Sequence, residues 1–106
     1  MRGHFVTVAL QGDYGKPRPA VTIQSNLFKD HPSVTILPLT SKLVQAPLFR
    51  ITLEPSAENG LHQRSQIMID KLMTVQRSKI GPTLGKLTDD EQISVNRSLM
   101  LFLGLA

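Results

Sequence analysis

The stretch that decides the fold runs from residue 15 to residue 26 and reads Gly15-Lys16-Pro17-Arg18-Pro19-Ala20-Val21-Thr22-Ile23-Gln24-Ser25-Asn26. Its first half predicts a rigid basic turn, because the prolines on either side of Arg18 fix their own φ and bias the residue before each toward extended backbone. Its second half alternates between apolar and polar side chains and predicts a strand over 19–25. A guanidinium held this firmly loses less entropy when it meets a phosphate. Arg18 is therefore a candidate phosphate ligand, and the alternative is a surface arginine in a loop stiffened for stability.

The composition limits both the class of protein and the class of partner. A chain of 106 residues is expected to form one domain over 1–106. It has no cysteine, which excludes disulfides, thiolate catalysis and cysteine-ligated zinc and fits a cytoplasmic protein. The net charge of +4 and the pI near 9.9 favour an anionic partner. No signal-peptide pattern is evident at the start, and the longest apolar run, 99–103, is too short to span a membrane.

Hydrophobic periodicity predicts a series of short strands before a single helix. Strands are expected over 4–10, 19–25, 34–37, 49–54, 65–70 and 72–76, with a last short strand within 80–87. Pro38 is expected to end the third of these, because proline cannot serve an interior ladder. Turns are expected over 11–15 and 55–60, and one helical turn at 27–29.

The clearest helix begins after Thr88. Thr88 and Glu91 have the spacing of a capping box, and the acidic residues between them suit the positive end of the helix dipole. Gly104 is expected to end the helix. Two neighbouring stripes run along this helix, Ile93, Asn96, Met100 and Leu103 in one and Val95, Leu99 and Phe102 in the other, and all but Asn96 are apolar. Strands followed by one packed helix predict an α+β fold, an antiparallel β-barrel or half-barrel with a C-terminal helix.

Four polar residues stand where the predicted strands begin or end. Arg18 opens the second strand, Thr40 and Ser41 follow the third, and Asp70 closes the strand over 65–70. A fixed cation, two hydroxyls and a carboxylate that met in space would suit phosphoryl chemistry, because the cation neutralises developing charge and the hydroxyls orient the phosphate. Taken singly, each of the last three has an ordinary explanation as a turn or cap residue.

The three histidines, His4, His31 and His62, lie too far apart for a helical metal pair and are expected at the surface or at strand edges. No phosphate-binding glycine loop and no Ser-His-Asp signature is present in the sequence. A hydrolytic reaction is therefore expected to proceed without metal, cofactor or histidine. RNA permits this, because its own 2′-hydroxyl can act as the nucleophile. The protein then needs only to position the RNA, remove the proton of that hydroxyl and neutralise the charge that develops on the phosphate.

Three blocks of the sequence resemble the motifs of the PemK/MazF toxins. They are GKPRPAVTIQS at 15–25, VTILPLTS at 34–41 and SQIMID at 65–70, in the family's order and spacing, and the opening Arg2-Gly3 and the closing helix also match. The resemblance implies a metal-independent endoribonuclease (an mRNA interferase) of a type II toxin–antitoxin system. Such an enzyme cuts single-stranded RNA at short sequences and leaves a 2′,3′-cyclic phosphate and a 5′-hydroxyl. An SH3-like barrel, a homodimer and a cognate antitoxin are also implied.

The resemblance assigns roles to individual residues. Arg18 matches the catalytic arginine of the family and Thr40 its catalytic threonine. Ser41, in the same motif, would help to hold the phosphate. Asp70 matches an acidic position that some members use as a base or for orientation.

Other positions differ from the family pattern, or are assigned a role from their location in the sequence alone. Met68 stands where some members carry a second arginine, and the loop between the first two strands is short and lacks the histidine found there in some members. Gln24 and Asn26 lie just past Arg18 and are predicted to touch RNA from their position only.

A sister branch keeps a second function open. CcdB, a poison of DNA gyrase without nuclease activity, shares the fold and resembles this chain over 21–26, at Pro38-Leu39 and in the terminal helix. The best-known member of that branch ends in Trp-Gly-Ile, whereas this chain ends in Leu103-Gly104-Leu105-Ala106, and it has alanine where Thr40 stands. Both differences favour RNA cleavage over the gyrase poison, and a bare RNA-binding module is the third candidate.

Overall fold

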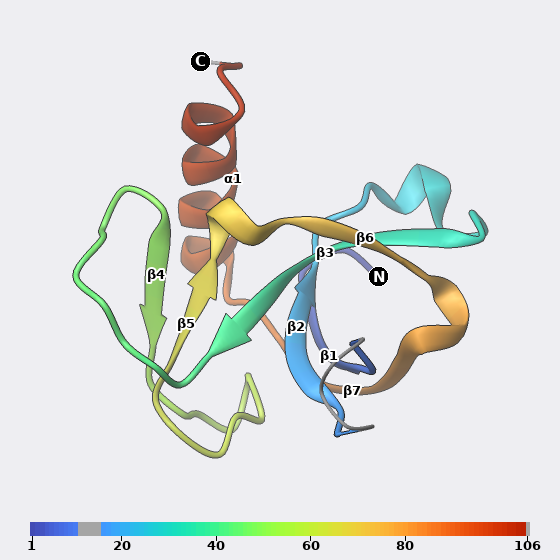
Figure 1. Ribbon diagram of the computed structural model, residues 1–106, viewed down its shortest axis with the longest axis horizontal. Coiled ribbons are helices and arrows are strands. Elements are labelled where there is room, and N and C mark those ends of the chain that lie inside the picture. Colours follow the sequence, from blue (N-terminus) through green and yellow to red (C-terminus); the bar gives the residue numbers. More distant parts are fainter. Residues whose placement is uncertain (11–15, 106) are drawn as a thin grey trace.

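The computed structural model describes residues 1–10 and 16–105, which form one antiparallel sheet and a C-terminal helix (Figure 1). The turn predicted over 11–15 lies outside the described residues. The strands are β1 (His4–Val8), β2 (Arg18–Thr22), β3 (Ser33–Thr40), β4 (Arg50–Leu53), β5 (Ser65–Met68), β6 (Met73–Gln76) and β7 (Ile80–Lys86). The helix is α1 (Asp89–Phe102), and single 3₁₀ turns are η1 (Asn26–Phe28), η2 (Ile69–Lys71) and η3 (Arg77–Lys79).

The strand order is β4-β5-β3-β2-β1-β7, and β6 pairs with the first half of β3, from Ser33 to Ile36. Every pairing is antiparallel. In the part of the chain that the structure describes, β4 and β7 are the two ends of this path and do not pair with each other, so the sheet is not closed into a barrel. The predicted antiparallel sheet with a C-terminal helix is confirmed.

β3 is longer than predicted, and the prediction that Pro38 ends it is wrong. On one side β3 pairs with β2, with Ala20 opposite Pro38. On its other side β3 pairs with β6 as far as Ile36 and with β5 from Leu39 onward. Pro38 is tolerated inside the sheet because it lies where β3 changes partner, so that no continuous ladder passes it on that side.

Other elements also differ from their predicted bounds. β1 ends at Val8 and not at residue 10, and β2 ends at Thr22 and not at residue 25. The strand expected over 65–70 ends at Met68, because the chain turns through η2, where Ile69 is fully buried and donates its N–H to Phe49 O at 3.0 Å. β7 covers seven residues and pairs with β1, so the last strand is longer than expected.

Alternation along the strands divides the apolar side chains between the two faces of the sheet. The larger core lies on the face that packs against α1 and includes Phe5 of β1. Val6 and Val8 of the same strand belong to a smaller cluster on the other face. Members of the larger core include Val21, Leu37, Leu39, Ile67, Ile69, Val95 and Leu99. The smaller cluster is Val6, Val8, Ala20, Val34 and Ile36.

α1 begins with the predicted capping box. Glu91 donates its N–H to Thr88 Oγ1 at 3.1 Å, and Thr88 donates its N–H to Glu91 Oε1 at 2.8 Å. Gly104 follows the last turn at φ +73°, a conformation that favours glycine. Of the two predicted stripes, the structure buries Val95 and Leu99, whereas Ile93 is 53% exposed. No helix among the described residues is long and apolar enough to cross a membrane.

The start of the chain joins the sheet to the helix. Arg2 donates from its guanidinium to Ile23 O and to Asn96 Oδ1 on α1, and from its backbone N–H to Asn26 Oδ1. Gly3 has φ +81°, and a Cβ there would lie 2.5 Å from Gln92 Oε1 on the helix. These contacts fix α1 across the end of β2.

Removing the cap should destabilise the whole fold, because α1 supplies Val95 and Leu99 to the core. We expect Thr88→Ala to lower the free energy of unfolding by about 1 kcal/mol in urea titrations. Ser94→Ala, at an exposed position inside the same helix, is the matched control and should leave the stability unchanged or slightly raised. Equal stability of the Thr88→Ala protein and the unsubstituted chain would contradict the importance of the cap.

Candidate functional site

The pairing of β2 with β3 brings the start of β2, at Arg18, near the end of β3, at Thr40. Ala20 pairs with Pro38 and Val21 with Leu37, so each step back along β2 is one step forward along β3. The paired residues end at Ala20 and Pro38, and Arg18 and Thr40 each lie two residues beyond that pair, at the start of β2 and at the end of β3. Both residues line the same two cavities, so they lie close to each other in the fold.

Arg18 and Thr40 both line two cavities. The first, the His62 cavity, has a volume of about 410 Å³ and is also lined by Lys16, Ser41 and His62. The second, the Asp70 cavity, has a volume of about 660 Å³ and is also lined by Asp70 and Lys71. Of the residues that the sequence singled out one by one, Arg18 and Thr40 thus line both cavities, Ser41 lines only the first and Asp70 only the second.

The hydroxyl of Thr40 is oriented by the chain that follows it. Thr40 Oγ1 accepts the N–H of Lys42 at 3.1 Å, so the hydroxyl proton remains available for another acceptor. Thr40 is half-buried, and both Arg18 and Ser41 are exposed. The arrangement offers a cation and the Thr40 hydroxyl to an anion in either cavity, and the Ser41 hydroxyl as well in the His62 cavity.

Asp70 is held by a cation from the neighbouring strand. Its Oδ1 lies 3.6 Å from Nε of Arg50, and the two side chains are 23% and 13% exposed. Both atoms are buried without a hydrogen-bond partner, so the contact is an ion pair at longer than hydrogen-bond distance. Arg50 stands directly opposite Met68 in the pairing of β4 with β5. A guanidinium therefore lies beside Asp70, although position 68 itself is a methionine.

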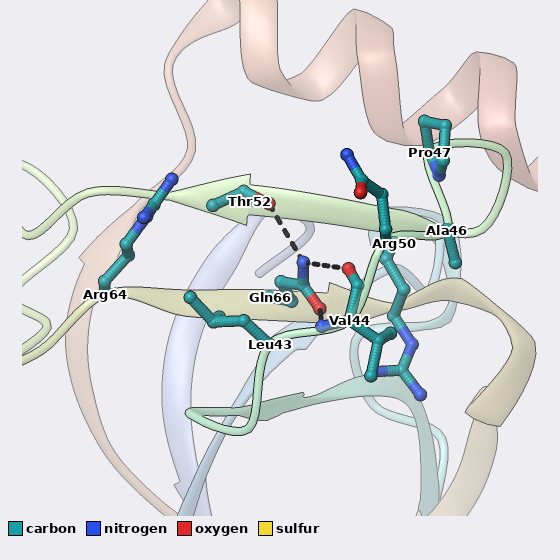
Figure 2. A pocket seen from close by; sticks show the side chains of 9 residues that line it. Leu43, Val44, Ala46, Pro47, Arg50, Thr52, Arg64 and Gln66 are labelled. Carbon is teal, nitrogen blue, oxygen red and sulfur yellow. Dashed lines mark hydrogen bonds between the residues drawn. The ribbon is translucent and has the colours of Figure 1, made fainter.

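A buried glutamine fixes the segment that follows Thr40 and Ser41. Gln66, which is 4% exposed, accepts the N–H of Val44 at 3.1 Å and donates to Val44 O at 2.9 Å and to Thr52 Oγ1 at 3.1 Å. Figure 2 shows this amide between β4 and the loop, inside a third cavity of about 440 Å³. The guanidinium groups of Arg50 and Arg64 lie at opposite ends of that cavity (Figure 2).

Gln24 and Asn26 are not brought together with Arg18. They lie past the other end of β2 and line a separate small cavity that includes neither Arg18 nor Thr40. Gln24 Nε2 donates to Phe28 O and Ser33 O, and its Oε1 accepts the N–H of Thr35. The Asn26 side chain accepts from Arg2. Both side chains form hydrogen bonds with backbone groups in the structure. Their contact with RNA stays a prediction.

Among the histidines, only His62 lines a cavity with Arg18 and Thr40 in the described part of the chain. His31 is exposed and accepts the N–H of Ser33 on its ring. Burial lowers the pKa of His4 below its ordinary value of 6.5, helped by the terminal ammonium and Lys86, so the neutral imidazole is favoured there. Sequence reasoning missed His62 in the site, since its place depends on the path of the loop between β4 and β5.

Two solved structures share this fold. An endoribonuclease in complex with its cognate antitoxin, from a mycobacterial species, has a TM-score of 0.83 at 22% identity, over 100% of this chain and 96% of that one. The Mycobacterium tuberculosis toxin MazF-mt6 also has a TM-score of 0.83, at 20% identity over 97% of this chain and 98% of the other.

Similarity in sequence extends over the whole chain. A probable endoribonuclease MazF from Mycolicibacterium smegmatis (strain ATCC 700084 / mc(2)155) is 42% identical over 106 residues, which cover 99% of this chain and 97% of the relative. The model of one protein family, described as PemK-like, MazF-like toxin of type II toxin–antitoxin system, matches residues 1–103. The chain therefore belongs to the PemK-like, MazF-like toxins of type II toxin–antitoxin systems.

Proposed function

We propose that this toxin is an endoribonuclease that cuts single-stranded RNA, mRNA in particular, at short sequences without a metal ion. Membership of the family and 42% identity to a probable endoribonuclease support the class of reaction. The observation that carries the assignment of the site is that Arg18 and Thr40 line the same two cavities. One phosphodiester bound at this pair would meet a cation and a hydroxyl donor together.

Each residue of the proposed site has a separate task. Arg18 neutralises the charge that develops on the phosphorane oxygens, and Thr40 and Ser41 donate hydrogen bonds to the phosphate. Asp70 takes the proton of the 2′-hydroxyl, which attacks the neighbouring phosphorus. Arg50 holds Asp70 through the ion pair at 3.6 Å and leaves the rest of that carboxylate in the cavity.

We infer the remaining properties from the family. The curved sheet is taken as an SH3-like arrangement, the active form as a homodimer in the cytoplasm, and the partner as an antitoxin. One of the structural neighbours is an endoribonuclease in complex with its cognate antitoxin. An acidic, flexible segment of such a partner would complement the basic groups Lys16, Arg18 and Lys71 around the two cavities.

Substitution of Arg18 tests the proposed site directly. With mixed single-stranded RNA in EDTA, we expect the unsubstituted chain to cleave and Arg18→Ala to lose about 10²–10³-fold in kcat. Arg18→Lys should fail nearly as badly, because an ammonium cannot offer two parallel N–H donors to a phosphate. Arg97→Ala removes the same charge from the exposed side of α1 and is the matched control. Intact RNA together with stalled gyrase would favour the gyrase poison instead.

The chemistry of the substrate gives a second test. Since the 2′-hydroxyl is the proposed nucleophile, we expect a DNA oligonucleotide of the same sequence to stay intact. The 5′ fragments of the cleaved RNA should carry a 2′,3′-cyclic phosphate, which mass spectrometry distinguishes from a 3′-phosphate or a 3′-hydroxyl. Cleavage of the DNA would contradict the mechanism.

The ion pair with Arg50 gives a third test, with an internal control at the other end of the cavity in Figure 2. We expect Arg50→Met to lower kcat about tenfold or more with little change in KM, because Asp70 loses its orientation as proton acceptor. Arg50→Lys should recover most of that loss, since the contact joins one nitrogen to one oxygen. Arg64→Met is the control, because Arg64 pairs with exposed Glu54 and not with Asp70.

A double-mutant cycle separates orientation of Asp70 from a general effect of charge. If Arg50 acts through Asp70, adding Arg50→Met to Asp70→Asn should cost no further activity. Additive losses, or an equal loss in Arg64→Met, would show that Arg50 contributes in another way. Melting curves of all variants establish that each is folded at the assay temperature.

A further inference from the structure

The two cavities divide the titratable groups of the proposed site between them. Arg18 and Thr40 line both cavities, whereas Asp70 lines only one of them and His62 only the other. A phosphate bound by Arg18 and Thr40 would therefore adjoin one cavity that holds a carboxylate and a second cavity that holds an imidazole.

Cleavage of RNA by its own 2′-hydroxyl requires this division. In an in-line displacement the attacking and leaving oxygens lie on opposite sides of phosphorus, so the group that removes one proton and the group that supplies the other must also stand apart. Arg18 is poorly suited to supply a proton, because a guanidinium does not give up its proton in proteins. Histidine is the residue type whose ordinary pKa suits proton donation near neutral pH.

We propose that His62 is the general acid that protonates the leaving 5′-oxygen, opposite Asp70 as the general base; this rests on the proposed function. The bond between the 2′-oxygen and phosphorus forms while the bond between phosphorus and the 5′-oxygen breaks. The 2′ proton passes to the Asp70 carboxylate, and a proton from the His62 imidazolium passes to the 5′-oxygen. The products are the 2′,3′-cyclic phosphate and the 5′-hydroxyl, and charge balances without a further reactant.

The loop that carries His62 is fixed on both sides of this exposed residue. Before it, Leu61 is buried in the main core and donates its N–H to Asn59 Oδ1 at 2.9 Å. Asn59 is 2% exposed and also donates to Glu54 O at 2.9 Å. After it, Gln63 O accepts from Ser65 Oγ at 2.9 Å.

The same loop packs directly on β7. Gly60 has φ +66°, and a Cβ there would lie 2.1 Å from Leu84 O. A Cβ at Gly85 would lie 2.1 Å from Glu58 O, which accepts the N–H of Lys86 at 2.9 Å. The position of His62 relative to Arg18 is thus set by the packed loop and by β7. A catalytic group gains from being held in this way before the substrate binds.

The test compares two substrates that differ in one atom. One is an RNA oligonucleotide that the chain cleaves, and the other has sulfur in place of the 5′-oxygen at the same phosphodiester. A thiolate leaves without protonation far more readily than an alkoxide, as the ordinary thiol pKa of about 8.5 indicates. His62→Gln keeps a polar side chain of similar reach but cannot supply a proton at neutral pH.

We expect His62→Gln to lose about 10²-fold in kcat on the oxygen substrate and less than about threefold on the sulfur substrate. Asp70→Asn and Arg18→Ala should lose activity on both, because the base and the cation are needed whichever atom leaves. His31→Asn is the matched control, as His31 lies outside both cavities and an asparagine oxygen can also accept the N–H of Ser33.

The outcomes separate this inference from the proposed function. Equal losses of His62→Gln on the two substrates would assign His62 to binding or folding and overturn the inference, as would full activity on the oxygen substrate. In both cases cleavage by the unsubstituted chain, abolished in Arg18→Ala, would leave the proposed function standing. A chain that cuts neither substrate would remove the proposed function and this inference with it.

Discussion

The register of one antiparallel strand pair sets the geometry of the proposed site. Because β2 begins at Arg18 and β3 ends at Thr40, the pairing of Ala20 with Pro38 brings these two residues close together just beyond the end of the ladder. A shift of one residue would turn either side chain to the other face of the sheet and separate the cation from the hydroxyl. The buried clusters on both faces resist such a shift, since Val21 and Leu37 belong to one core and Ala20 and Ile36 to the other. The packing of the fold and the placement of the proposed catalytic pair thus depend on the same register.

Around this pair, buried polar contacts place groups that the ladder itself does not carry. Gln66 holds Val44 and so fixes the segment that follows Ser41, while Arg50 holds Asp70 where the chain leaves β5. A buried carboxylate or amide without a partner is costly, which makes each of these arrangements specific as well as stabilising. The proposed chemistry uses side chains whose positions the rest of the sheet already determines.

Local patterns predicted much of the fold, and contacts between distant segments account for the rest. The capping box at Thr88 and the strand that contains Val21 follow from neighbouring residues, and both are present. Pro38 was expected to end a strand because its neighbours do not reveal that β3 changes partner there. Motif resemblance singled out Arg18, Thr40 and Asp70, which the fold brings together. Neither the pairing of Arg50 with Asp70 nor the place of His62 could be read from spacing, because each depends on how β4, β5 and their loop pack.

The basic residues around the two cavities make ionic strength part of the behaviour of this protein. Lys16, Arg18 and Lys71 line the two cavities that share Arg18 and Thr40. Each contact between such a cation and a phosphate of single-stranded RNA releases condensed counterions. Three contacts therefore correspond to a fall of roughly 2 in log affinity for a tenfold rise in salt concentration. The affinity for RNA measured in dilute buffer would then be higher than the affinity at the salt concentration of a cell. The binding of an acidic competitor to the same cations would weaken with salt in the same way.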